Sequence, residues 1–138
     1  MSDARAEVAA ALWRFLDAFE QLAWDAFRAC FADDACVFFP SAATPERFTG
    51  RAAVEARFAE VFDAERRAAP SGPPYLELVP EALDIQLPAA GVAIASFVLR
   101  NRDRLARRTI VFRRDAGTWR IVHLHGSNVP WLDAPAPP

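Results

Sequence analysis

The sequence has no lysine and only two cysteines, and its net charge is −2, with all sixteen basic residues being arginine. So small a net charge gives no field that would gather nucleic acid, and we expect no nucleic-acid partner. Cys30 and Cys36 lie six positions apart, with no CxxC pair and no second Cys/His cluster. This pattern is typical of reduced thiols, so we expect neither a metal nor another cofactor.

Long apolar runs are also absent, since no stretch approaches the ~20 residues that a membrane-spanning helix needs. The first ten residues, MSDARAEVAA, lack the basic start and apolar stretch of a secretion signal. We therefore expect a cytoplasmic protein without a membrane partner. A chain of 138 residues suits one domain, which we place at 1–131, followed by a disordered proline-rich tail at 132–138.

Apolar periodicity predicts helices at residues 4–22 and 24–31 and a third helix after Gly50. Strands are expected at 35–40, 82–87, 92–99, 108–114 and 118–125. The last four are joined by short connections, which favour an antiparallel meander. This order predicts an α+β domain with helices packed on one face of a curved sheet.

Three segments in this order resemble the nuclear-transport-factor-2-like superfamily: CFADDACVFF, FTGRAAV and GTWRIVHLHGS. The chain looks most similar to the SnoaL-like branch and to the association domain of calcium/calmodulin-dependent kinases. The resemblance implies a cone, in which three N-terminal helices pack on a strongly curved, mixed and mostly antiparallel sheet, a cystatin-like α+β roll. It also implies an apolar cavity and a homodimer formed through the convex face of the sheet.

The resemblance to ketosteroid isomerases allows their polar positions to be carried over to this chain. The base falls on Phe39, the phenol on Phe15 and the protonated acid on Thr109. Phenylalanine neither accepts nor donates a proton, so isomerisation by that route is excluded. The arginine-rich pocket of the kinase association domain corresponds here to Val98, Thr109 and Gly126, which argues against a shared ligand.

The two histidines, His123 and His125, share one face of a strand because their spacing is two. If Thr109 faces the cavity, Leu124 and Gly126 do so as well, and the histidines lie on the convex face. A β-bulge would reverse this register and turn an imidazole inward as a general base. Metal binding by the pair is a third interpretation, although a third ligand is missing. Asp84, within a strand of apolar residues, is a further general acid or base, or simply solvent-exposed.

The aromatic residues predict either a filled cone or an apolar pocket, since the chain has eleven phenylalanines and four tryptophans. The expected lining is Phe15, Phe19, Trp24, Phe39, Phe58, Phe62, Val98, Thr109, Val111, Leu124 and Gly126. We interpret the arginine-rich run at 100–108 as a solvated hairpin whose charges discourage edge-to-edge association.

Three functions fit these observations. The first is a homodimeric module that binds a hydrophobic or aromatic metabolite. The second is a SnoaL-like cyclase, isomerase or dehydratase that uses His123, His125 or Asp84 as its general acid or base. The third is an assembly domain.

Overall fold

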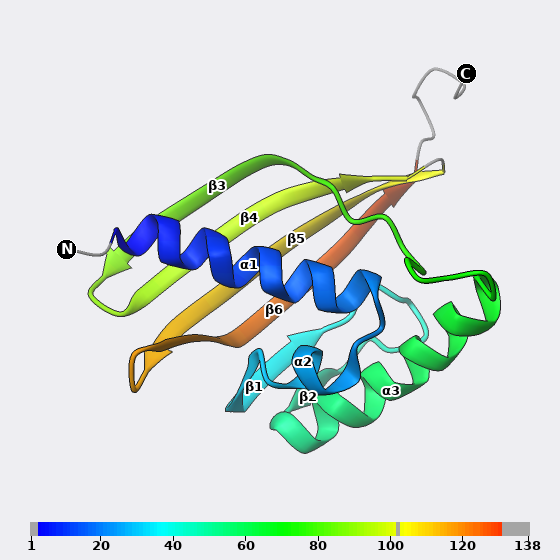
Figure 1. Cartoon of the computed structure of the whole chain (residues 1–138), viewed down its shortest axis with the longest axis horizontal. Helices are drawn as coiled ribbons and strands as arrows, with labels where there is room; N and C mark the ends of the chain where they lie inside the picture. Colours follow the sequence, from blue (N-terminus) through cyan, green and yellow to red (C-terminus); the bar gives the residue numbers. More distant parts are fainter. Residues whose placement is uncertain (1–2, 102, 131–138) are drawn as a thin grey trace.

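A computed structural model describes residues 3–101 and 103–130; the expected tail lies outside this range. Three helices and six strands follow one another along the chain: α1 (Ala4–Glu20), α2 (Trp24–Arg28), β1 (Phe31–Phe38), β2 (Arg47–Thr49), α3 (Arg51–Ala68), β3 (Pro80–Ala89), β4 (Val92–Arg100), β5 (Arg104–Asp115) and β6 (Thr118–Pro130). The six strands form one sheet in the order β2-β1-β6-β5-β4-β3. Helix α1 lies across β3 to β6, and α2 and α3 lie beside β1 and β2 (Figure 1).

The predicted α+β class and the mixed, mostly antiparallel sheet are confirmed. Strands β3 to β6 form the expected antiparallel meander, and β1 joins β6 in parallel. Such a parallel pair needs a long connection, and here the whole chain from β2 to β5 supplies it. The sheet curves around α1, so one face is inner and the other is outer (Figure 1).

The strands are longer than their hydrophobic runs predict. β2 lies in a segment that we expected to be a loop, and it pairs with the C-terminal half of β1. β5 begins at Arg104 within the arginine-rich run, because its backbone continues to pair with both β4 and β6. Hydrogen bonding to two neighbours therefore holds a charged segment in a strand despite its low β-propensity.

An extra residue in β6 sets the two faces of the sheet. Val111 pairs with His123, but the next residue, Phe112, pairs with Ile121, so Val122 is bulged out of the ladder. Ile121 before the bulge and Leu124 after it are both buried against the helices. Trp119 and Ile121 thus lie on the inner face, whereas the sequence pattern alone groups them with the histidines.

Phe27, in the short helix α2, is the centre of an aromatic cluster. It is 1 % exposed, and its ring centroid lies 4.8 Å from those of Phe58 and Phe62 and 5.2 Å from those of Phe15 and Phe19. Most of these contacts are edge-to-face or tilted, the geometry that aromatic quadrupoles favour. The cluster joins all three helices to the start of β1.

No helix among the described residues is long and apolar enough to span a membrane.

Replacement of Phe27 by alanine should lower the free energy of unfolding by about 3–5 kcal/mol, because it leaves a cavity that six aromatic neighbours surround. The matched control is Trp13→Ala on α1, whose side chain is half exposed and should change stability by only ~0.5 kcal/mol. Equilibrium urea unfolding measures both. Equal losses in the two variants would contradict a core centred on Phe27.

Candidate functional site

The inner face of the sheet changes from apolar to polar along β4, β5 and β6. Below the middle of α1 the three strands contribute Ala95, Ile110 and Leu124, all buried. The next inner row is Phe97, Arg108 and Gly126. Beyond it lies a third row, Leu99, Ala106 and Asn128. A charged side chain therefore follows directly on the apolar core.

Arg108 is held over the inner face by oxygen atoms of its own sheet. Its Nη1 donates to the backbone oxygens of Arg107 and Ser127 at 2.9 and 3.2 Å and to Oδ1 of Asn128 at 3.3 Å. All three bonds use one nitrogen, and within residues 3–101 and 103–130 the structure shows no acceptor for Nε or Nη2. Nε and Nη2 therefore have no hydrogen-bond partner among the described residues.

The charge of Arg108 has no opposite charge beside it. No carboxylate of the described residues forms an ion pair with this side chain. Burial, together with the positive charge of Arg104, lowers the pKa of Arg108 to about 10. A half-buried cation without a carboxylate is unusual, because buried charges are normally paired.

One acidic side chain lies near this cluster of cations. Burial raises the pKa of Glu65 in the last part of α3, and the charge of Arg104 partly opposes that rise. The loop after α3 closes the same end of the cone, since Leu78 donates its backbone N–H to Oε2 of Glu20 at 2.7 Å. Arg104 thus interacts electrostatically with both Arg108 and Glu65, although Glu65 forms no ion pair with Arg108.

Gly126 makes room for the guanidinium. A Cβ atom at this position would lie 3.1 Å from Nη1 of Arg108 and 3.1 Å from Cδ of Pro40, closer than ordinary van der Waals contact. A larger residue here would require Arg108 or Pro40 to shift by a few tenths of an ångström, so glycine leaves room for both side chains. Gly126 and Leu124, both predicted to line the pocket, do lie on the inner face.

The aromatic side chains predicted to line the pocket pack on one another. Phe15, Phe58 and Phe62 are buried, and Phe19 and Trp24 pack against them with ring centroids 5.3–6.2 Å apart. Phe39 follows β1 and contacts the rings of Phe48 and Phe58. These rings pack into one continuous aromatic cluster, which accounts for the aromatic richness of the sequence.

Three other residues predicted to line the pocket lie on the opposite side of the sheet. Thr109 pairs with His125 and Val111 pairs with His123, so both share the outer face with the histidines. Val98 pairs with Arg107 and also lies outside, whereas its neighbour Phe97 is buried inside. Thr109, carried over as the isomerase acid, therefore lies on the outer face of β5, and its two inner neighbours are Arg108 and Ile110.

The predicted acid and base residues also lie on the outer face. Nδ1 of His123 is 3.0 Å from Sγ of Cys36, and the ring of His125 lies 5.2 Å from that of Phe38. Burial lowers the pKa of His123, and the charges of His125 and Arg47 act in the same direction. Asp84 is exposed and pairs with Ser96, on the side opposite to buried Ile85.

From the sequence we expected that a β-bulge would turn an imidazole inward. The bulge in the structure has the opposite effect. In a regular strand, with Val122 in the ladder, the histidines would continue the face of Trp119 and Ile121 and point inward. Because Val122 is bulged out of the ladder, they point outward. Within the described part of the chain, no three His, Cys, Asp or Glu side chains come together as a metal site would require.

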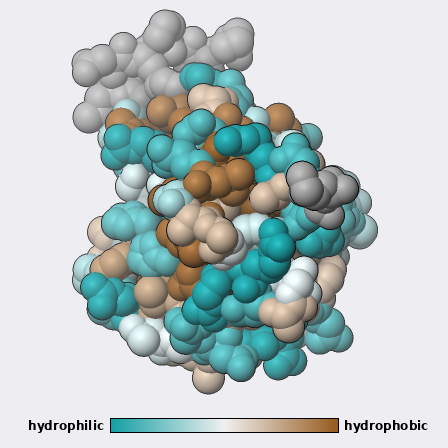
Figure 2. Space-filling view, turned by 90° about the vertical axis from the view of Figure 1, so that its left-hand side faces the viewer, coloured by the Kyte–Doolittle hydropathy of each residue, from teal (hydrophilic) through white to brown (hydrophobic). Residues whose placement is uncertain are grey.

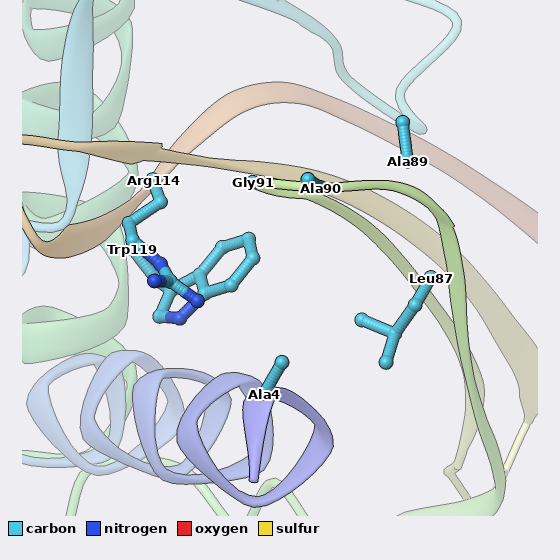
Figure 3. A pocket seen from close by; sticks show the side chains of 7 residues that line it. All are labelled: Ala4, Leu87, Ala89, Ala90, Gly91, Arg114 and Trp119. Carbon is cyan, nitrogen blue, oxygen red and sulfur yellow. The ribbon is translucent and has the colours of Figure 1, made fainter. Parts of the chain in front are cut away.

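A separate pocket of about 690 Å³ lies at the other end of the inner face, near the N-terminus of α1 (Figure 3). Its lining is Ala4, Leu87, Ala89, Ala90, Gly91, Arg114 and Trp119. Figure 2 shows apolar surface at the centre of this end of the molecule, surrounded by hydrophilic residues. The guanidinium of Arg114 lies 5.0 Å from the centre of the Trp119 ring and 3.7 Å from Oε1 of Glu7. In contrast to Arg108, this cation has a carboxylate partner.

Sequence reasoning missed Arg108 because it lies in a run of arginines that was interpreted as solvated. A signal was present, since Arg108 is in phase with the apolar residues Ala106, Ile110 and Phe112 along the strand. An arginine in phase with buried Ile110 and Phe112 belongs to the inner face. The sequence analysis took Thr109 as facing the cavity, and this assigned its neighbour Arg108 to the outer face.

Residues 8–131 match the family described as SnoaL-like domain. No curated protein sequence matches the chain. Among solved structures, the CamKII hub homology domain of Chlamydomonas reinhardtii is similar with a TM-score of 0.73 and 20% identity, covering 92% of this chain and 99% of that one.

Two further structures share the fold. A proposed dehydratase of the NTF2-like family from Streptomyces avermitilis has a TM-score of 0.73 and 16% identity, with coverage of 90% of this chain and 95% of that one. A protein with a cystatin-like fold from Caulobacter vibrioides has a TM-score of 0.70 and 18% identity, with coverage of 91% and 89%. At these identities the likeness concerns the fold, which hosts unrelated activities.

Replacement of Arg108 by methionine should raise the free energy of unfolding by ~1 kcal/mol, because it removes a half-buried charge that no carboxylate compensates. Arg107→Met is the matched control: its side chain lies on the outer, exposed side of the same strand and should change stability by less than ~0.5 kcal/mol. Urea unfolding at neutral pH checks both. A marked loss of stability in Arg108→Met would instead give the guanidinium a structural role.

Proposed function

The chain belongs to the SnoaL-like domain family, and we propose that it binds a small molecule that has an apolar, aromatic body and an anionic end. The observation that carries this proposal is Arg108, a half-buried cation with an open guanidinium edge and no carboxylate partner among the described residues. The anionic end would bind Arg108. The body would lie toward the aromatic wall at the end of β1.

The chemistry of the guanidinium supports a carboxylate as the anionic end. Arginine presents parallel N–H donors that match the two oxygens of a carboxylate, and charge-assisted pairs of this kind are stronger than neutral hydrogen bonds. The hydrogen bonds to Ser127 and Asn128 fix the position of Nη1 before a ligand arrives. An arginine that is held in place loses little conformational entropy on binding, which favours affinity.

Catalysis by the predicted acid and base residues has less support. His123, His125 and Asp84 lie on the outer face, and the sheet separates them from Arg108. A cyclase, isomerase or dehydratase that worked in the cone would need a proton-transfer group on its inner face. We therefore favour binding over catalysis through these three residues.

A second copy of the chain is proposed to cover the outer face. Ile94, Val98 and Val111 are half-buried apolar side chains at outer positions of β4 and β5. Helices α1 and α3 pack on the inner side, so this stripe has no cover from them (Figure 1). A twofold axis through the sheet would place the stripe against its own copy, the usual arrangement of a homodimer.

Phenylpropionate should stabilise the protein against heat, whereas its amide, which has the same shape without the charge, should not. Arg108→Met should abolish the effect of the carboxylate, and Arg107→Met should preserve it. The measurement is the midpoint of thermal unfolding across a ligand titration. Equal stabilisation by acid and amide, or by acid in wild type and Arg108→Met, would refute the proposed role of the cation.

Val111→Arg should convert a dimer of 15.3 kDa chains into monomers, because it places a charge on the axis of the proposed interface. Ala56→Arg, on the exposed side of α3, is the control that should leave the dimer intact. Sedimentation velocity distinguishes the two states, with circular dichroism to confirm folding. A wild-type monomer at micromolar concentration would contradict the interface.

A further inference from the structure

The outer face contains a thiol and an imidazole in direct contact. Cys36 in β1 and His123 in β6 are register partners in the parallel pair, so their side chains leave the sheet on the same side. Sγ of Cys36 lies 3.0 Å from Nδ1 of His123, close for a contact that involves sulfur. Two strands that are far apart in sequence hold these groups together, and both side chains are only partly buried.

One arginine lies near this pair. Arg47 in β2 lies with its guanidinium 5.1 Å from the centre of the Phe38 ring, and that ring in turn contacts both imidazoles. The charges of Arg47 and His125, together with burial, lower the pKa of His123. A neutral imidazole with an unprotonated Nδ1 can take a proton from the thiol.

The other cysteine provides an internal reference. Cys30 is partly buried like Cys36, but its Sγ donates to the backbone oxygen of Ala26 at 3.4 Å, and no imidazole is in contact with it. Burial raises the pKa of this thiol, although the charges of Arg14 and Arg120 partly oppose the rise. The two thiols are thus both partly buried, but only that of Cys36 is in contact with an imidazole.

We propose that Cys36 and His123 form a nucleophile and base pair that reacts covalently with α,β-unsaturated carbonyl compounds. Nδ1 of His123 removes the thiol proton, and Sγ of Cys36 forms a bond to the β-carbon of the electrophile. The electron pair of the carbon–carbon double bond moves toward the carbonyl as an enolate, and the imidazolium returns its proton to the α-carbon. The product is a thioether, and no oxidant or reductant takes part.

This site is independent of the ligand site in the cone. The pair lies on the opposite side of the sheet from Arg108, and reaction at Cys36 needs no group on the inner face. The adduct would change the outer face, where a second copy is proposed to bind. Addition of a group at Cys36 is therefore a modification of the surface and not a step of catalysis in the cone.

Acrylamide is a suitable probe because it reacts slowly by this one route. The whole protein is exposed to an excess of acrylamide at neutral pH, and mass spectrometry of peptides gives the rate at each cysteine. We expect Cys36 to react more than ~10-fold faster than Cys30, since a positioned base contributes about 10²–10⁴-fold to proton transfer. His123→Asn should lower the Cys36 rate by ~10-fold or more and leave Cys30 unchanged.

His125→Asn is the matched control, because His125 shares the strand face but contacts Phe38. It should leave the Cys36 rate within about twofold of wild type, well below the effect of a lost base. Equal rates at the two cysteines in both wild type and Val111→Arg, or a Cys36 rate that His123→Asn lowers in neither background, would overturn the proposal. The Cys36 rate is also measured in Val111→Arg, which is expected to be monomeric. Fast reaction in this variant together with slow reaction in wild type supports a reactive pair that a second copy covers. Slow reaction in both overturns the proposal.

Discussion

The strict alternation of side chains across a strand is the constraint on which the rest of this structure depends. Each residue of β5 and β6 must face either the helices or the outside, and one extra residue exchanges the two sets. The bulge at Val122 makes that exchange inside β6, so Ile121 and Leu124 both reach the core. Because of the same bulge, both imidazoles point outward and Gly126 lies in the inner row.

Much of the fold follows from periodicity in the sequence. The buried positions of α1 repeat every three or four residues, and the four C-terminal strands are joined by turns that only an antiparallel arrangement allows. Boundaries were less predictable, because pairing with neighbours extends a strand beyond its apolar residues. β2 has only three residues, and it forms because the edge of β1 is available for pairing. The local sequence does not show this edge.

The candidate site was less accessible to sequence reasoning than the fold. Its key residue, Arg108, lies in an arginine-rich run. Which of these arginines faces inward depends on the register of β5, and an error of one residue reverses the assignment. The aromatic residues were recognised, but whether rings enclose space or fill it depends on rotamers and distances. Contact between Cys36 and His123 depends on a parallel pairing of strands 87 positions apart, which no local pattern reveals.

The position of β1 in the sheet also constrains how the chain reaches its native state. β1 is complete at Phe38, yet its parallel neighbour is β6, the last strand of the described chain. During synthesis the aromatic faces of α1 and α2 therefore emerge long before the strand that closes the cone around them. Such long-range pairing slows folding, and exposed apolar surface favours aggregation in the interval. A truncation that removes β6 would leave β1 and β5 each with an open edge, and the ribosome-bound chain passes through that state every time it is made.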